Sequence, residues 1–142
     1  MPRDAKTDAD IQKCFAVMSE LRTNLTSDDF LQTIRHMESE GFRLAYIEDT
    51  EGVVAVAGYR IYTNLFLGKN LYVDDLVTSA SARSKGYGKQ LLDWLREKAR
   101  EADCRAYHLD SGTQRGQAHK FYFNQGFTIT SYHFSEQLQN GD

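Results

Sequence analysis

A strand, a glycine-containing loop and an amphipathic helix follow one another near the middle of the chain, and this succession limits the folds that the chain can adopt. Residues 71–78 (LYVDDLVT) are rich in the β-branched, aromatic and aliphatic side chains that strands favour. Leu91, Leu92, Leu95 and Ala99 then recur at helical spacing, with charged residues on the opposite face. A strand that leads through a loop into such a helix predicts a mixed α/β fold.

The remaining segments extend this prediction to the whole chain. The spacing of the apolar residues changes several times between the helical and the strand period. It predicts elements in the order helix, helix, strand, strand, strand, helix, strand, helix, strand, at residues 8–22, 26–41, 44–47, 53–62, 71–78, 88–100, 107–109, 118–126 and 127–134. Because the single Pro lies at position 2 and no repeat or linker interrupts the chain, we predict one domain over residues 1–142.

Composition places the chain among soluble proteins. Of the 142 residues, 41% are hydrophobic and 26% are charged, as in ordinary globular domains. No apolar run reaches the roughly 20 residues that span a membrane, and the polar residues 1–6 lead into no apolar signal core. We therefore expect a cytoplasmic protein with no membrane partner.

Charge and cysteine content argue against two further classes. The net charge of −3 and the lack of a basic tract disfavour nucleic acid as a partner. Cys14 and Cys104 are the only cysteines, and neither lies near a second Cys or a His at metal-ligand spacing. We expect no metal site and interpret both cysteines as core residues rather than redox groups.

The strongest chemical signal in the sequence is the segment 83–88 (RSKGYG), between the predicted strand and helix. Glycines let the backbone turn sharply and let a ligand approach it closely. The unpaired amides of the first helical turn, together with the helix dipole, favour an anion such as a pyrophosphate. Arg83, Lys85 and Lys89 add positive charge. The alternative is a glycine-rich turn that binds no ligand. The spacing of the glycines in residues 83–88 matches neither the Rossmann nor the Walker phosphate-binding loop.

Residues 83–88 match the pattern [QR]-x-x-G-x-[GA] of the GNAT superfamily of N-acetyltransferases, which the sequence resembles. Residues 118–127 (AHKFYFNQGF) are similar to a second segment of that family, A-x-x-F-Y-x-x-x-G-F. The resemblance implies a central, mostly antiparallel sheet flanked by helices and splayed between its fourth and fifth strands. It places the first strand at residues 2–6. Many members carry Asn where this chain has Arg115, and residues 115–122 look most like aminoalkylphosphonate acetyltransferases.

The resemblance also implies a co-substrate, acetyl-CoA. In the family the loop amides hold the pyrophosphate, the strand backbone pairs with the pantetheine arm, and a strand amide near Leu76 or Val77 faces the oxygen of the thioester carbonyl. His119 precedes the Phe-Tyr pair and is expected near the cofactor. The expected cofactor-binding residues are Leu76, Val77, Thr78, Arg83, Ser84, Lys85, Gly86, Tyr87, Gly88, Lys89 and His119.

Acetyl transfer to an amine needs a proton donor for the departing thiolate and an acceptor for the amine proton. The resemblance suggests Tyr122 as the donor, since a phenol with a pKa near 10 stays protonated at neutral pH. The alternative for Tyr122 is a core tyrosine on the inward face of its helix.

For the base, the resemblance favours Asp74, directly or through a water. Asp75 is interpreted as structural, because neighbouring residues of a regular strand point to opposite faces. We also expect local irregularity in this strand where it splays from its neighbour. Arg60, Tyr62 and Tyr72 are candidates for the acceptor pocket, with sheet packing as the alternative. The other histidines, at positions 36, 108 and 133, are expected to be structural.

The function that we predict is acetyl-CoA-dependent N-acetylation of a small-molecule primary amine by direct attack. The alternatives are a transferase that acts on a protein N-terminus or lysine, an acyl-CoA-binding module without chemistry, and a nucleotide-phosphate binder. The compact chain has no appended recognition domain, which favours a small acceptor. Because members of the family are often dimers, a homodimer is a further prediction.

Overall fold

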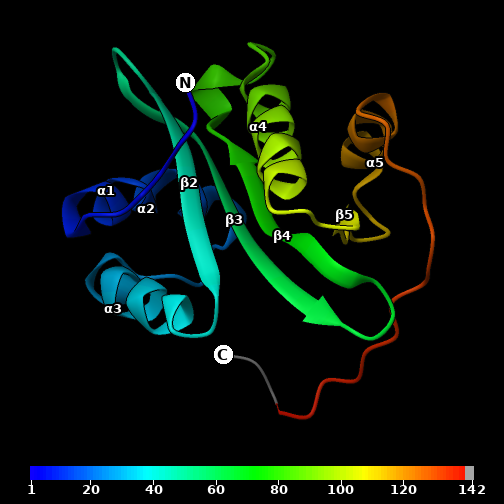
Figure 1. The fold of residues 1–142 in the computed structure, drawn as a ribbon. Helices are drawn as coiled ribbons and strands as arrows, with labels where there is room; N and C mark the ends of the chain where they lie inside the picture. The colour runs from blue at the N-terminus through cyan, green and yellow to red at the C-terminus, as the bar shows by residue number, and fades with distance from the viewer. Residues whose placement is uncertain (140–142) are drawn as a thin grey trace. The chain divides into compact units, whose positions relative to one another are not determined.

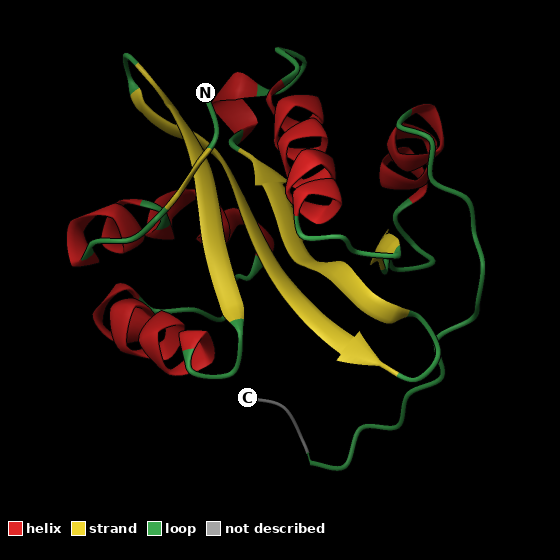
Figure 2. Ribbon diagram, viewed as in Figure 1, coloured by secondary structure: helices red, strands yellow, loops and turns green. Residues whose placement is uncertain are grey.

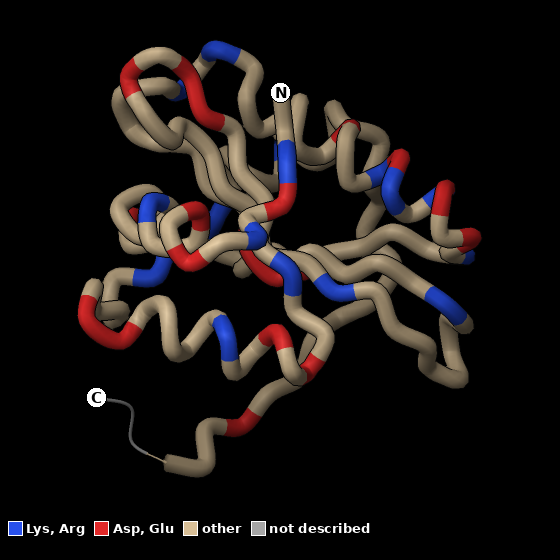
Figure 3. The backbone as a smooth tube through the Cα atoms, turned by 60° about the vertical axis from the view of Figure 1, so that its left-hand side comes forward, with Lys and Arg blue, Asp and Glu red and all other residues tan. Residues whose placement is uncertain are grey.

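The computed structural model describes residues 1–139, which fall into two compact units, Met1–Leu109 and a second that begins at Asp110. The organisation of residues 1–142 as one domain stays a prediction. None of the helices in the described residues is both long and apolar enough to cross a membrane. Figure 3 shows acidic and basic residues interspersed along the chain.

A five-stranded sheet forms the centre of the first unit (Figure 2). The strands lie in the order of the sequence: β1 Arg3–Asp4, β2 Phe42–Asp49, β3 Gly52–Asn64, β4 Gly68–Thr78 and β5 Ala106–Leu109. Neighbours pair antiparallel except β4 and β5, which run parallel. The mostly antiparallel sheet agrees with the predicted fold, and the short strand expected within residues 2–6 is β1.

Helices cover both faces of this sheet. Figure 1 shows α1 (Asp8–Lys13), α2 (Phe15–Leu21) and α3 (Ser27–Glu38) on one side and α4 (Tyr87–Glu101) on the other. Strand residues alternate between the two cores, since Leu44 and Tyr46 pack with α1–α3 whereas Ala45 and Ile47 pack on the α4 side. This alternation fixes which face each side chain of β3 and β4 occupies.

The helix predicted over residues 8–22 is two helices, which is a correction to the sequence interpretation. Cys14 ends α1 and precedes α2, and its N–H donates to Ile11 O in a tightened last turn. Its thiol is fully buried, as expected of a core cysteine, and burial raises its pKa to about 12. Cys104 is half-buried.

The second unit contains the predicted helix, α5 (Gly116–Asn124), and an irregular tail. Gly126 has a φ of 93° and the N–H of Phe127 donates to Tyr122 O, which is the arrangement of a helix that ends at a glycine. The strand predicted at residues 127–134 is wrong, because these residues form no strand. Ile129, Tyr132 and Phe134 are 70%, 85% and 92% exposed. Such residues are common in strands, but no strand among the described residues pairs with them.

Candidate active site

The candidate site begins at an irregularity in β4. Gly58 of β3 lies opposite Asp75, and the next residue, Tyr59, lies opposite Val73. Asp74 is therefore an extra residue, a β-bulge that turns the strand locally. The irregularity expected near Leu76 and Val77 lies two residues earlier.

The bulge brings Asp74 and Asp75 to the same face of the sheet, which corrects the alternation expected of a regular strand. Arg60 follows Tyr59, which packs in the α4-side core, so Arg60 points to the α1–α3 side. Its guanidinium binds Asp74, with 2.9 Å between Nη2 and Oδ2. Asp75 lies on that side too, since a Cβ atom at Gly58 would touch both its Oδ2 and the ring of Phe42.

A second arginine joins this group from α2. Arg22 donates from Nε to Asp75 Oδ1 at 2.8 Å and from Nη2 to the backbone oxygen of Asp74 at 3.0 Å. The side chains of Asp74 and Asp75 are 17% and 12% exposed, whereas those of Arg60 and Arg22 are 35% and 49% exposed. We call these four residues the charge quartet. Arg22 was not identified as a site residue from the sequence. Arg22 lies at the end of a predicted helix and belongs to no motif, so its sequence neighbours do not indicate a role in the site.

Burial dominates the electrostatics of Asp74. Removal from water raises the pKa of its carboxyl, and the hydrogen bond and charge of Arg60 oppose this rise. Arg60 in turn has a raised pKa, first because of its hydrogen bond to Asp74. Asp74 is thus a more basic carboxylate than a surface aspartate, held in place by a guanidinium.

The end of β4 has an uncovered edge within the first unit. β5 pairs with residues 70–73 and ends at Leu109, so residues 74–78 have no strand partner on that side. The N–H of Ser79 donates to Val54 O in β3. Because successive residues of a strand turn their amides to opposite sides, Leu76 and Thr78 direct their N–H groups to the uncovered edge, and Val77 directs its N–H to β3.

The loop between β4 and α4 exposes further amides. Ser84 and Gly86 have φ values of 69° and 84°, and α4 begins directly afterwards at Tyr87. No side chain caps this helix, and the first intrahelical bond runs from Gln90 N to Gly86 O. A Cβ atom at Gly86 would meet nothing within 4 Å. The first-turn amides therefore face open space, as an anion site requires.

The predicted cations of this loop differ in their surroundings. Lys89 forms an ion pair with Asp93 one turn along α4, at 2.6 Å, so its charge is already engaged. Arg83 and Lys85 are exposed and form no ion pair or hydrogen bond with the part of the chain that the structure describes. Tyr87 donates from its hydroxyl to Asp49 Oδ2 at 3.4 Å.

Tyr122 and His119 belong to the second unit. The Tyr122 ring packs against those of Phe121 and Phe127, with centroids 5.5 and 6.0 Å away. Burial raises the pKa of the phenol, and Arg115 opposes this rise. His119 donates from Nε2 to Gly112 O at 2.7 Å, since a carbonyl only accepts. Ser111 Oγ is buried and has no hydrogen-bond partner among the described residues.

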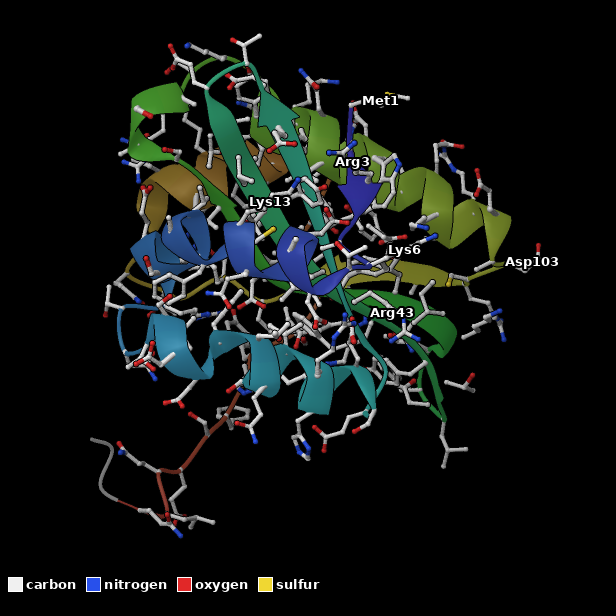
Figure 4. All side chains as sticks on the ribbon, turned by 90° about the vertical axis from the view of Figure 1, so that its left-hand side faces the viewer. Met1, Arg3, Lys6, Lys13, Arg43 and Asp103 are labelled. Atoms are coloured by element: carbon white, nitrogen blue, oxygen red, sulfur yellow. The ribbon has the colours of Figure 1, made fainter. Side chains whose placement is uncertain are left out.

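A separate hollow lies beside β1. Its lining includes Glu38. It also includes Lys6 and Arg43, which Figure 4 labels. Strands β2 and β3 separate it from the uncovered edge of β4, so it is not part of the candidate site.

The comparison with protein families decides the class. Residues 10–127 match the model of the acetyltransferase (GNAT) family. The chain belongs to the GNAT family. This confirms the resemblance seen in the sequence and the enzyme class, N-acetyltransferase.

Individual relatives of this GNAT acetyltransferase agree with the assignment. The uncharacterized N-acetyltransferase YhdJ of Bacillus subtilis is 40% identical over 126 residues, which cover 87% of this chain and 89% of YhdJ. The aminoalkylphosphonate N-acetyltransferase of Salmonella typhimurium is 32% identical over 66 residues, 46% of this chain and 43% of that protein. The structure of AAC(6')-Iy, in complex with a bisubstrate analogue built on CoA, has a TM-score of 0.83 at 14% identity and covers 99% of this chain and 98% of that one. At this identity the likeness shows the fold.

The edge of β4, the start of α4 and the charge quartet can be related to the chemistry of the GNAT family. The family uses acetyl-CoA. The uncovered edge of β4 and the uncapped start of α4 offer hydrogen-bond donors, and the charge quartet includes two carboxylates of β4, Asp74 and Asp75. The first unit thus combines uncapped helix-start amides and a paired carboxylate on one strand–loop–helix segment.

Proposed function

We propose that this GNAT enzyme transfers an acetyl group from acetyl-CoA to the primary amine of a small molecule by direct attack. The observation that carries the proposal is the pairing of exposed amides on β4 and α4 with the buried carboxylate of Asp74 at the β4 bulge. A binding module without chemistry needs the amides but not a carboxylate with a raised pKa.

The residues present fit acetyl-CoA. First-turn amides from Tyr87 onward and the free cations Arg83 and Lys85 suit a pyrophosphate. The N–H groups of Leu76 and Thr78 suit the amides and carbonyls of a pantetheine arm, and that of Leu76 is the candidate donor to the thioester oxygen. The parts of Ser84, Gly86, Gly88, Lys89, Val77 and His119 in cofactor binding stay predictions. When bound, acetyl-CoA supplies an activated acetyl group.

Asp74 is the candidate residue for binding the acceptor amine. Its carboxylate attracts an ammonium group, and it either anchors that group or takes its proton. Arg60 keeps the carboxylate oriented through contacts to both oxygens. Asp75, which accepts a hydrogen bond from Arg22 and lies opposite Gly58, has a structural role in this proposal.

Tyr122 is the candidate for the proton donor to the departing sulfur, an assignment that rests on the family motif. Its aromatic surroundings and raised pKa keep the phenol protonated over the whole neutral range. A protonated phenol is the form that a general acid requires.

A small acceptor is favoured over a protein. The charge quartet is mostly shielded, with both carboxylates under one-fifth exposed. An acceptor must reach past Arg22 and Arg60, which suits a small amine better than a folded protein surface. The Salmonella relative is named for aminoalkylphosphonates, which are small amines, and this supports the same class. The cytoplasmic location and the homodimer stay predictions.

Two measurements test the proposal. Isothermal titration with acetyl-CoA, CoA and ATP should give binding of both CoA forms and none of ATP. Thiol release from acetyl-CoA should then rise with at least one amine from a panel of 2-aminoethylphosphonate, spermidine and a lysine-containing peptide. Binding of ATP in place of CoA, or acetylation of the peptide alone, would overturn the cofactor or the acceptor class, respectively.

A further inference from the structure

Arg22 and Arg60, the cations of the charge quartet, carry N–H groups that their partners do not use. A guanidinium has N–H groups on every one of its nitrogens. Arg22 binds Asp75 through Nε and the backbone oxygen of Asp74 through Nη2. Arg60 binds the carboxylate of Asp74 through Nε and Nη2. In both guanidinium groups, Nη1 has no hydrogen-bond or ion-pair partner among the described residues.

The exposed part of the charge quartet is cationic, although its positive and negative charges balance. The side chain of Arg22 is 49% exposed and that of its partner Asp75 is 12% exposed. The corresponding values for Arg60 and Asp74 are 35% and 17%. A molecule that approaches from solvent therefore meets guanidinium nitrogens before it meets either carboxylate.

The packing of α2 fixes the position of Arg22, which directly follows this helix. The buried residues of α2 lie in the core that also contains Val77 of β4. Glu20 of the same helix accepts the N–H of Ala80, just after β4, at 2.9 Å, so the helix end is tied to this strand a second time. Because Arg22 is already held in place, it loses little further freedom when it binds a ligand.

Arg22 is better suited than Arg60 to bind an external anion. Both engaged nitrogens of Arg60 bind a carboxylate, that of Asp74. The pKa of Arg60 is raised first by this hydrogen bond and, more weakly, by the charge of Glu40. Arg22 gives one of its two hydrogen bonds to a backbone oxygen, which carries no net charge. The positive charge of Arg22 is thus less compensated within the protein.

Asp74 retains room for an ammonium group. Its Oδ2 takes two contacts from Arg60, at 2.9 and 3.0 Å, whereas its Oδ1 takes a longer one of 3.3 Å. A carboxylate oxygen can accept more than one hydrogen bond, so Oδ1 can accept a further one. Arg22 contacts the backbone oxygen of the same residue. A carboxylate that can bind a cation and a guanidinium that can bind an anion are therefore joined at Asp74.

We propose that the acceptor is a zwitterionic small molecule, a primary amine that also carries an acidic group such as a carboxylate or phosphonate, and that Arg22 selects it; this rests on the proposed function. Asp74 holds the ammonium group, and Nη1 of Arg22 binds the anionic group. Arg60 orients Asp74 and adds positive charge. An amine without an acidic group leaves Arg22 unused, and a polyamine brings a second cation against it, so both are poorer acceptors.

The first experiment compares acceptors that differ in the charge of one end. β-Alanine with β-alaninamide tests a carboxylate, and 2-aminoethylphosphonate with its dimethyl ester tests a phosphonate. In the wild type, kcat/KM should be about 10-fold or more higher for the anionic member of at least one pair, as expected of a hydrogen bond between charged groups. The pair that shows this preference identifies the acidic group. The absence of a preference in both pairs would overturn the inference.

The second experiment compares Arg22→Gln with Arg35→Gln. Arg35 of α3 is the matched control, since it also binds one aspartate, Asp8, and one backbone oxygen, that of Lys6. Arg22→Gln should lower the ratio of kcat/KM within the preferred pair by about 10-fold or more, mainly through a higher KM for the anionic acceptor. Arg35→Gln should keep the wild-type ratio. An effect on folding or on Asp74 acts on both members of a pair and cancels in the ratio, so an unchanged ratio in Arg22→Gln would overturn the role of Arg22.

An inhibition experiment on the wild type does not depend on the folding of a variant. Propionate or ethylphosphonate, acids that lack the amine, should inhibit competitively with the amine and not with acetyl-CoA. Competition with acetyl-CoA alone, or no inhibition by either acid, would contradict an anion site at Arg22. Failure of the wild type to acetylate any charged or neutral amine would instead overturn the proposed function itself.

Discussion

Arg60 holds both carboxylate oxygens of Asp74, with Nε 3.0 Å from Oδ2 and 3.3 Å from Oδ1. Asp74 follows Val73, which packs on the α4 side, so Asp74 faces the α1–α3 side with Arg60, and the β4 bulge brings Asp75 to that face as well. In the function that we propose, a carboxylate oriented in this way presents a fixed negative charge to the ammonium group of the acceptor.

Asp74→Asn should therefore lower kcat/KM for the amine by about 10²-fold, because it removes the charge that receives the ammonium. Affinity for acetyl-CoA, measured by titration, should not change. Asp75→Asn is the matched control, since it removes a neighbouring carboxylate that contacts Arg22 instead. A larger loss of activity in Asp75→Asn than in Asp74→Asn would reverse the two assignments.

Tyr122→Phe should leave acetyl-CoA binding intact and slow acetyl transfer by about 10²-fold or more, the usual contribution of a general acid. Because burial raises the pKa of Tyr122, loss of its proton should not reduce the wild-type rate below pH 10, the ordinary pKa of a tyrosine. The measurement is the single-turnover rate against pH. Phe121→Leu, a change to the neighbouring ring, is the packing control. A rate in Tyr122→Phe equal to that of wild type, with chemistry limiting, excludes the assignment.

Local signals predicted the parts of the fold that depend on neighbouring residues. The glycines and basic residues at 83–88 indicated the loop before α4, and the spacing of Leu91, Leu92, Leu95 and Ala99 indicated the helix itself. The strands predicted at residues 44–47 and 53–62 likewise correspond to β2 and β3, which pair antiparallel. In each case the deciding interactions lie within a few residues of one another.

Features that depend on distant partners were not predicted. The bulge at Asp74 arises from the register with β3, and Arg22 reaches Asp75 from 53 residues earlier in the sequence. A strand was expected at residues 127–134, yet a strand also needs an edge to pair with. Likewise, the interaction of His108 with Asn70 becomes visible only when β4 and β5 are aligned.

Gly86→Asp should abolish binding of acetyl-CoA, because it places a negative charge beside the first-turn amides of α4. Gly41→Asp is a close control: its φ of +96° resembles the +84° of Gly86, and neither site has an atom within 4 Å of a new Cβ. Both variants carry the same backbone strain, so their thermal stability should fall alike. Titration should detect acetyl-CoA binding in Gly41→Asp only, and retained affinity in a folded Gly86→Asp protein would refute the anion site.

Gly58→Ala should destabilise the fold and disturb the charge quartet together. A Cβ atom at residue 58 would lie 2.4 Å from Cζ of Phe42 and 2.6 Å from Oδ2 of Asp75. Phe42 is only 1% exposed, so its ring has little room to move away. Overpacking of this kind costs about 1–3 kcal/mol, measurable as a lower urea midpoint. Gly116→Ala, where a Cβ meets nothing within 4 Å, should cause no loss. Equal midpoints for Gly58→Ala and wild type would mean that Phe42 and Asp75 yield easily, and that Gly58 does not hold Asp75 in place.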